Sequence, residues 1–382
     1  MIQNRQTRPT TRRAFLATGV AGTAAALAGC SGSGSGGTTT GPMFEGGNET
    51  SGDGGAPSVA DLPDLEGDLT VYLGRGEGGV YGQLVDYLQD TRYENFSVTL
   101  KRGPSTGLAN TILTEAENGG SPADVFWSID AASLALVADA GLAAALPADV
   151  AGVVPGKFRD PRDRWVGLTG RARAIPYNTD VLSASDVPKS VFDIPGSEAF
   201  RDALGWAPSY GSFQAFVTAM RVLEGEDRTR AWLNAIQDTG VQSYAGEFGV
   251  TYGVANSEVA AGFANHYYAL RLLQAKPDAP LDLAFTENDP GALVNVAGAL
   301  VLDSTPKPSL AANFVRHFLT REIQQYLVEH VYSYPLAPGV APPDGGSITL
   351  PSLDDLHPPD LDLATLANVQ ETAALLRDTG VL

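Results

Sequence analysis

The chain has 382 residues and a formal net charge of −19, with 44 acidic and 25 basic side chains. Only five of the basic residues are lysines, and an acidic, lysine-poor composition fits a protein kept soluble in high salt. This charge balance argues against nucleic acid as a partner, because no cation-rich face is available to neutralise phosphates.

The N-terminus resembles an export signal. Arg12 and Arg13 form a twin-arginine pair, and an apolar run of small residues follows over 14–28. The run is too short and too rich in Ala and Gly for a membrane span, and it ends at a Leu-Ala-Gly-Cys sequence that resembles a lipobox. We expect residues 1–30 to direct twin-arginine export, with lipidation at Cys30 anchoring the protein to the outer face of the cytoplasmic membrane. The alternative is an ordinary secretory signal with an incidental cysteine.

The composition after Cys30 predicts a tether followed by two lobes. Residues 31–64 are rich in Gly, Ser and Thr without a sustained apolar pattern, which is typical of a disordered tether. The remaining chain is too long for one core of typical size. We assign 65–172 and 298–348 to lobe 1, and 173–297 and 349–382 to lobe 2.

Short apolar runs alternate with amphipathic segments, a pattern that predicts an α/β fold with mixed sheets flanked by helices. The first part of the chain shows three pairs of a strand followed by a helix. The expected strands are 69–73, 96–100 and 124–127, and the expected helices begin near 80, at 108–117 and at 133–140.

The second part continues the alternation. Residues 165–178 read as extended chain that passes between the lobes, across a hinge. Further strands are expected at 204–207, 259–264 and 291–302, and further helices around 213–223, at 268–274, at 313–328 and at 364–376.

Two adjacent tyrosines lie where a strand is expected to end and a helix to begin. Asn265 is placed to cap that helix, and the turn can aim the hydroxyls of Tyr267 and Tyr268 into one cleft. A phenolate oxygen suits a hard trivalent cation, and a nearby ion and a helix N-terminus favour loss of the phenol proton. The alternative is two aromatic rings at a packing junction, and the spacing alone leaves both open.

A second loop predicts an anion site. Ser209, Gly211 and Ser212 surround Tyr210 at the expected start of a helix, where free backbone N–H groups attract anions. A simple helix cap explains the same residues. The four histidines are scattered and no Cys-x-x-Cys occurs, which argues against zinc. No catalytic triad or Gly-x-Ser-x-Gly elbow is found, so an enzyme is not expected.

Several segments in the same order are similar to the ferric-ion-binding periplasmic proteins of ABC importers. They include Arg164-Trp-Val-Gly-Leu-Thr-Gly-Arg-Ala-Arg173, Gly205-Trp-Ala-Pro-Ser-Tyr-Gly-Ser-Phe-Gln214 and Asn265-His-Tyr-Tyr268. The resemblance implies a two-lobed, type II periplasmic-binding fold with a hinge. It also implies Fe(III) as ligand, with phosphate or carbonate as a synergistic anion.

The resemblance also implies roles for individual residues. Tyr267 and Tyr268 match the paired metal ligands, and Tyr210 is a further metal-ligand candidate. By the same resemblance, Asn265 and the loop of Ser209, Gly211 and Ser212 match groups that bind the anion.

Some positions depart from the family pattern. Gly76 stands where some members have a histidine ligand, and Ile129 stands where some have a glutamate, with Asp130 beside it. Glu247 lies near a position that is often asparagine in the family. Further site candidates are therefore Glu247, Arg75, Glu77 and Asp130.

These features predict an extracytoplasmic protein that captures ferric iron and delivers it to an ABC permease and its ATPase, as a monomer. One alternative is the same fold binding an organophosphonate, a thiamine-like compound or an oxyanion. A lipid-anchored hydrolase is the third reading.

Overall fold

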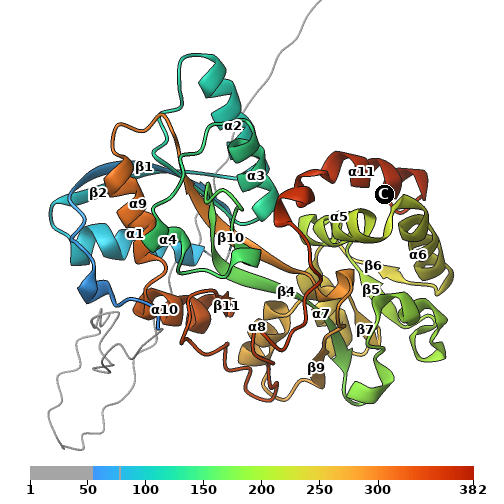
Figure 1. Cartoon of the computed structure of the whole chain (residues 1–382). Helices are drawn as coiled ribbons and strands as arrows, with labels where there is room; N and C mark the ends of the chain where they lie inside the picture. Colours follow the sequence, from blue (N-terminus) through green and yellow to red (C-terminus); the bar gives the residue numbers. More distant parts are fainter. Residues whose placement is uncertain (1–54, 77–78) are drawn as a thin grey trace, which may run out of the picture. The chain divides into compact units, whose positions relative to one another are not determined.

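The computed structural model describes residues 55–76 and 79–382, which belong to one compact unit (Figure 1). The export signal with Arg12 and Arg13, the lipidation candidate Cys30 and the site candidate Glu77 lie outside the described residues.

Three parallel strands form the edge of the first sheet. β1 pairs in parallel with β2 and with β3, and the antiparallel strand β10 joins β3 to the long strand β4. Their bounds are β1 Gly67–Gly74, β2 Phe96–Gly103, β3 Val125–Ser128, β4 Val166–Asn178 and β10 Val294–Val301. The short strand β11, Tyr334–Pro335, also pairs with β4.

Strand β4 is shared by two sheets. Its first half, up to Ala172, pairs with β10, whereas its second half, from Arg173, pairs with strands of the second sheet. Those strands are β5 Leu204–Trp206, β6 Gln242–Ser243, β7 Ala261–Gly262, β8 Ala264–Asn265 and β9 Leu281–Ala284. The change of partners falls where the sequence analysis placed the first boundary between lobes; the full division into lobes stays a prediction.

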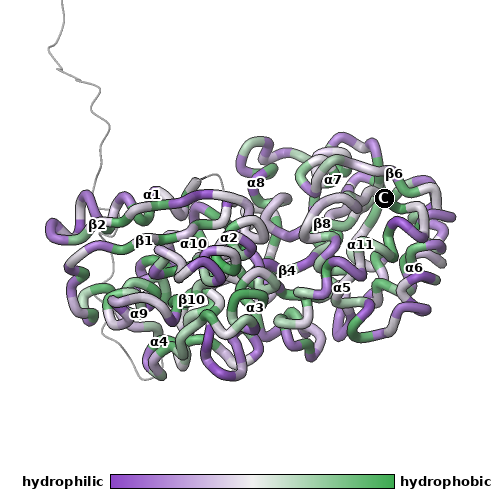
Figure 2. Tube along the Cα trace, turned by 90° about the horizontal axis from the view of Figure 1, so that it is seen from above, coloured by the Kyte–Doolittle hydropathy of each residue, from purple (hydrophilic) through white to green (hydrophobic). Residues whose placement is uncertain are grey.

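Helices cover both sheets, and hydrophilic stretches alternate with hydrophobic ones along them, as expected for helices with one buried side (Figure 2). Around the first sheet lie α1 Val80–Tyr87, α2 Ser105–Glu117, α3 Ala131–Asp139, α4 Ala148–Ala151, α9 Pro308–His317 and α10 Arg321–Val331. Around the second lie α5 Gly211–Glu224, α6 Glu226–Asp238, α7 Glu247–Ala255, α8 Tyr267–Ala275 and α11 Val369–Asp378.

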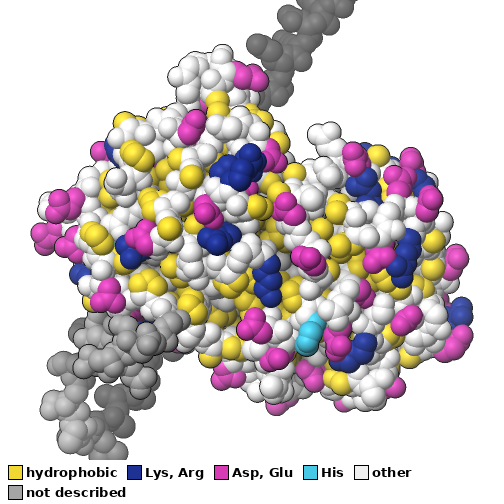
Figure 3. Space-filling model, in the orientation of Figure 1, with side chains coloured by type: hydrophobic (Ala, Val, Ile, Leu, Met, Phe, Trp, Pro, Cys, Tyr) yellow, Lys and Arg dark blue, Asp and Glu magenta, His cyan; other side chains and the backbone are white. Residues whose placement is uncertain are grey.

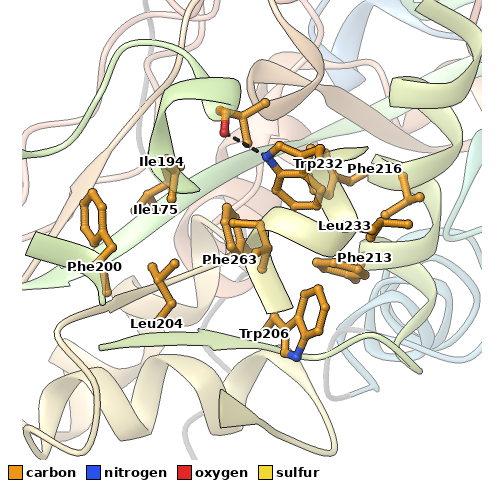
Figure 4. Packing of buried hydrophobic residues seen from close by; sticks show 14 of the residues in the cluster. Ile175, Ile194, Phe200, Leu204, Trp206, Phe213, Phe216, Trp232, Leu233 and Phe263 are labelled. Carbon is orange, nitrogen blue, oxygen red and sulfur yellow. Dashed lines mark hydrogen bonds between the residues drawn. The ribbon is translucent and has the colours of Figure 1, made fainter. Parts of the chain in front are cut away.

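Aromatic rings fill the core of the second sheet and its helices (Figure 4). Phe216 of α5 stacks on Phe263 with ring centroids 6.2 Å apart, and Trp232 of α6 packs edge-on against both rings. The indole N–H of Trp232 donates a hydrogen bond to the carbonyl of Val191 at 2.9 Å. This packing fixes α5, whose first turn reaches the candidate site.

Two expectations about segment limits need correction. The helix predicted over 313–328 is broken, because Thr320, at the N-cap position of α10, takes an extended conformation. Its hydroxyl donates back to the His317 carbonyl of α9 at 2.6 Å and does not cap α10. Residues 55–64, assigned to the tether, pack on the folded part: Leu62 and Val59 are buried, and the Val59 N–H donates to Glu322 at 2.9 Å. These apolar side chains are too few and too widely spaced to form a visible sequence pattern.

Acidic side chains are scattered over the surface among other residue types. On the face shown in Figure 3 they are spread widely, with basic side chains among them. This distribution agrees with the acidic composition.

The buried imidazole of His317 predicts a pH dependence of stability. Its Nδ1–H donates to the Asn313 carbonyl at 2.7 Å and its Nε2 accepts from the Tyr93 hydroxyl at 2.8 Å, so the neutral form is held. Burial lowers the pKa of His317 to about 4. The unfolded state therefore binds the extra proton first, and this contribution to stability is present above about pH 6.5 and is lost as the pH falls toward 4, at up to about 1.4 kcal/mol per pH unit.

Denaturant unfolding at pH 7 and pH 5 checks this expectation. His317→Gln should lower stability at pH 7 and show a smaller loss between the two pH values than the wild type. The exposed His357→Gln serves as a control and should keep the wild-type difference. An unchanged pH difference in His317→Gln would contradict the assignment.

Candidate functional site

A cavity of about 460 Å³ opens where the ends of both sheets meet. The parallel strands β1, β2 and β3 end at the same edge of the first sheet, and the residues that follow each of them line the cavity, as do the start of α5 and the middle of β4. The polar and charged lining residues are Arg75, Thr106, Asp130, Ser133, Arg171, Arg173, Tyr210, Ser212, Gln214, Asn265 and Asn295.

Three helix N-termini contribute to this lining. The first turns of α2, α3 and α5 reach the cavity through Thr106, Ala132 and Gly211. The backbone N–H groups of a first helical turn have no partner within the helix, and the helix dipole adds partial positive charge there. The cavity is therefore suited to a negatively charged ligand.

Two arginines of β4 add full positive charges. Arg171 and Arg173 are two residues apart on the strand, so their side chains lie on the same face. Both residues are buried, and both line the cavity. The Arg171 guanidinium donates to the carbonyl of Ile129 at 2.5 Å and to the hydroxyl of Tyr267 at 2.6 Å. Arg173 is paired with the buried carboxylate of Glu247.

Tyr267 lies behind this wall with its hydroxyl oxygen turned to lining residues. The ring is 1% exposed, and the hydroxyl accepts from Arg171 and, at 3.2 Å, from the amide of Asn265. Asn265 thus contacts the phenol oxygen; the expected helix cap is wrong, because the N-cap position belongs to His266.

Tyr268 and Tyr210 form a hydroxyl pair. Their oxygens are 2.6 Å apart, and Tyr210, at the N-cap of α5, lines the cavity. Burial raises the pKa of Tyr268 well above its usual range, and negative charge on Tyr267 or Tyr210 would add to the effect. Tyr268 is therefore protonated at neutral pH in this state. The Tyr267 and Tyr268 ring centroids are 4.5 Å apart, so the three phenols gather in one cluster.

Glu247, a further site candidate, lies below the cavity wall. It is fully buried at the first turn of α7, and besides its pairing with Arg173 it accepts the backbone N–H of Asn265 at 3.0 Å. It is not among the lining residues, so it acts on the cavity through Arg173 and Asn265.

Asp130 lines the cavity, but its carboxylate caps helix α3. One carboxylate oxygen accepts the Ser133 backbone N–H at 2.7 Å, which caps α3, and the other contacts the Ser133 hydroxyl at 3.2 Å. Of the other candidates, Arg75 and Ser212 line the cavity, whereas Ser209 is exposed and does not.

The candidate oxygen donors for a metal ion are the phenol hydroxyls. Within the part of the chain that the structure describes, no group of three or more His, Cys, Asp or Glu side chains is close enough to hold a metal ion. His266 is buried with its Nε2 2.8 Å from the Tyr332 carbonyl, so it does not reach the cavity. A hard cation bound here would combine phenolate oxygens with donors from outside the chain.

The site residues predicted from the sequence do not include Arg171 and Arg173. The available signal was two arginines at positions i and i+2 of an otherwise uncharged strand, which places both on one face of β4. A buried arginine needs a polar or charged partner, so two arginines at this spacing predict a positively charged surface with such partners nearby.

Comparisons with known proteins identify the family of this chain. A sequence profile of bacterial extracellular solute-binding proteins matches residues 120–354. The chain is 30% identical over 327 residues to an Fe(3+)-binding periplasmic protein of Serratia marcescens, covering 85% of this chain and 93% of the relative. A major ferric iron-binding protein of Neisseria meningitidis serogroup B is also 30% identical, over 331 residues, covering 85% and 96%.

The structure agrees with a solved relative as well. Iron-bound HitA from Pseudomonas aeruginosa superimposes with a TM-score of 0.70 at 30% identity, over 82% of this chain and 99% of that chain. Fold and cavity thus define a solute-binding protein of the type II periplasmic-binding class, and the predicted fold class is confirmed. In particular, the chain belongs to the family of bacterial extracellular solute-binding proteins, within which it is similar to ferric-iron binders.

The capping geometry of Asp130 predicts how substitutions there behave. Asp130→Ala should lower the free energy of unfolding by about 1 kcal/mol, because the cap of α3 is lost. Asp130→Asn should stay close to wild type, since asparagine caps equally well. Denaturant unfolding measures both, and ligand binding should be retained in Asp130→Asn. A loss of binding in that well-folded variant would show that the carboxylate is itself a ligand.

Proposed function

We propose that this chain captures ferric iron together with an exogenous anion and delivers it to an ABC permease. The observation that carries the proposal is the cluster of Tyr210, Tyr267 and Tyr268 beside a cavity lined by arginines and helix N-termini. Of the three tyrosines only Tyr210 lines the cavity, whereas Tyr267 and Tyr268 are buried next to it. The relatives named as ferric-iron binders support the choice of cation.

The phenols would bind the cation as phenolates. The pKa of Tyr268 is raised by burial, so the trivalent cation must displace its proton. Arg171, which donates to the Tyr267 oxygen, would compensate the negative charge that develops there as the proton leaves. For Tyr210 and Tyr268, the contact between their hydroxyls has to be broken or shared with the metal.

An anion would complete the coordination of the cation. Three phenolates leave a six-coordinate ferric ion short of donors, and the lining of Arg75, Arg171 and Arg173 with the α5 N-terminus suits a carboxylate, carbonate or phosphate. We assign Gly211, Ser212 and Asn265 to the anion, and leave Ser209 out because it does not line the cavity.

The cellular setting is also part of the proposal. We infer export through Arg12 and Arg13, a lipid anchor at Cys30, a monomeric binding role without catalysis, and an ABC permease with its ATPase as partners. Among the described residues, no helix combines the length and apolarity needed to cross a membrane.

A second candidate is an organic or inorganic oxyanion bound without metal. The observation in its favour is that the Tyr267 oxygen already accepts two hydrogen bonds, while the arginine-rich wall alone attracts anions. The experiment below separates the two functions.

Ferric salt with bicarbonate, phosphate or citrate should give the purified protein a visible phenolate-to-iron absorption band. Tyr267→Phe and Tyr268→Phe should each lose most of the band, because each removes an oxygen donor. Tyr334→Phe is the matched control: this tyrosine is also fully buried, but its hydroxyl donates to the Pro351 carbonyl, away from the cavity. Thermal melts verify that the variants fold.

A different result would contradict iron capture. Absence of a band with all three anions, combined with a thermal shift by an anion alone, would reject iron capture and favour the oxyanion.

Iron binding should weaken as the pH falls. The pKa of Tyr268 is raised, so its phenol holds a proton that ferric binding must release, and each released proton changes affinity about tenfold per pH unit. Competition with a chelator of known stability constants between pH 5.5 and 7.5 should show at least this slope. A pH-independent affinity would contradict phenolate ligation.

A further inference from the structure

Arg173 lines the cavity, and one edge of its guanidinium group has no hydrogen-bond partner among the described residues. The side chain is 4% exposed, one nitrogen (Nη1) is paired with Glu247, and the group lies 5.1 Å from the Phe216 ring centroid. The other terminal nitrogen, Nη2, is buried and has no hydrogen-bond partner among the described residues. A buried charged donor without a partner is unfavourable, and an oxygen atom of a ligand would remove this cost.

Glu247 holds the guanidinium in this orientation. The carboxylate is fully buried and is itself fixed, because its second oxygen accepts the Asn265 N–H at 3.0 Å. Two fixed points, the ion pair and the aromatic ring, leave Arg173 little freedom to turn. The unsatisfied edge is therefore built into the wall.

A second group of donors lines the same cavity. Ser212, in the first turn of α5, has a buried hydroxyl oxygen without a hydrogen-bond partner among the described residues. The backbone N–H groups of this turn and the Asn265 amide, already near the Tyr267 oxygen, complete a set that is rich in donors. Asp130, the carboxylate of the lining, is engaged with Ser133.

We propose that Arg173, held by Glu247, is a specificity-determining residue for the anion, and that its unpaired edge binds an oxygen of a carboxylate, carbonate or phosphate group. The inference deepens the proposed function and rests on it for the role of the anion. The planar fork of arginine suits such oxygens better than a lysine ammonium does.

The ion pair makes the proposal distinguishable from a purely structural role. If the pair only stabilises the fold, removing either partner damages the site in the same direction. If Arg173 binds the anion, removing Arg173 weakens anion binding, whereas neutralising Glu247 strengthens it, because the arginine charge is no longer compensated. Glutamine at 247 keeps an oxygen acceptor for Arg173.

The test titrates the iron-free full chain with phosphate, citrate and bicarbonate by calorimetry. Arg173→Gln should raise the anion dissociation constant by about tenfold to a hundredfold. Glu247→Gln should lower it by about threefold or more. Arg173→Lys, which keeps the charge, should fall between wild type and Arg173→Gln, and it keeps the test available if Arg173→Gln fails to fold. The anion that binds most tightly identifies the source of the oxygens.

Arg164→Gln is the matched control. Arg164 also forms an ion pair with a buried carboxylate, that of Asp160 at 2.6 Å, but it does not line the cavity. Its loss should lower stability and leave anion binding unchanged.

Two results would overturn the inference: weaker anion binding in both Glu247→Gln and the Arg173 variants, or unchanged anion binding in well-folded Arg173 variants. Either result leaves iron capture standing if the absorption band still forms. Conversely, loss of the band in wild type would reject iron capture while the calorimetric result on Arg173 holds.

Discussion

The contact that organises the site is the one between buried arginines and oxygen atoms along β4. Arg171 and Arg173 lie inside the protein, and each must find negative or polar partners there. Arg171 finds the Ile129 carbonyl and the Tyr267 hydroxyl, and Arg173 finds Glu247. Through these partners the end of β3, the start of α7 and the start of α8 are tied to one strand.

The surrounding helices reinforce the same electrostatic preference. The parallel strands β2 and β3 end together, so the helices α2 and α3 that follow them begin at the cavity, where the N-terminus of α5 joins them. The net charge of the chain is strongly negative, yet the lining is basic. An acidic exterior and a basic cavity are compatible because Arg171 and Arg173 are buried and separated from the surface charges.

Much of this arrangement could be predicted from the sequence. Apolar runs followed by Gly or Ser and an amphipathic stretch identified β1, β2 and β3 with their helices, since period and turn residues are local signals. The tyrosine pair was placed correctly at the junction of β8 and α8.

Other features depend on contacts between distant segments and were not predictable in this way. The pairing of Arg173 with Glu247 joins residues far apart in sequence, and the capping of α3 by Asp130 competes with a ligand role that the residue type equally allows. Likewise, the packing of Val59 depends on Glu322, which only the folded chain brings near. Short-range sequence patterns do not predict contacts between residues so far apart in the chain.

The division of β4 between two sheets has a mechanical consequence. Arg171 belongs to the half that pairs with β10, and Arg173 to the half that pairs with β8. A bend of the strand at Ala172 changes the separation of the two guanidinium groups. A single rigid anion in contact with both groups would fix this separation, and with it the angle between the two sheets. Anions of different length would then hold the two sheets at different angles, and a permease that senses this angle could tell a correctly loaded protein from one carrying the wrong anion.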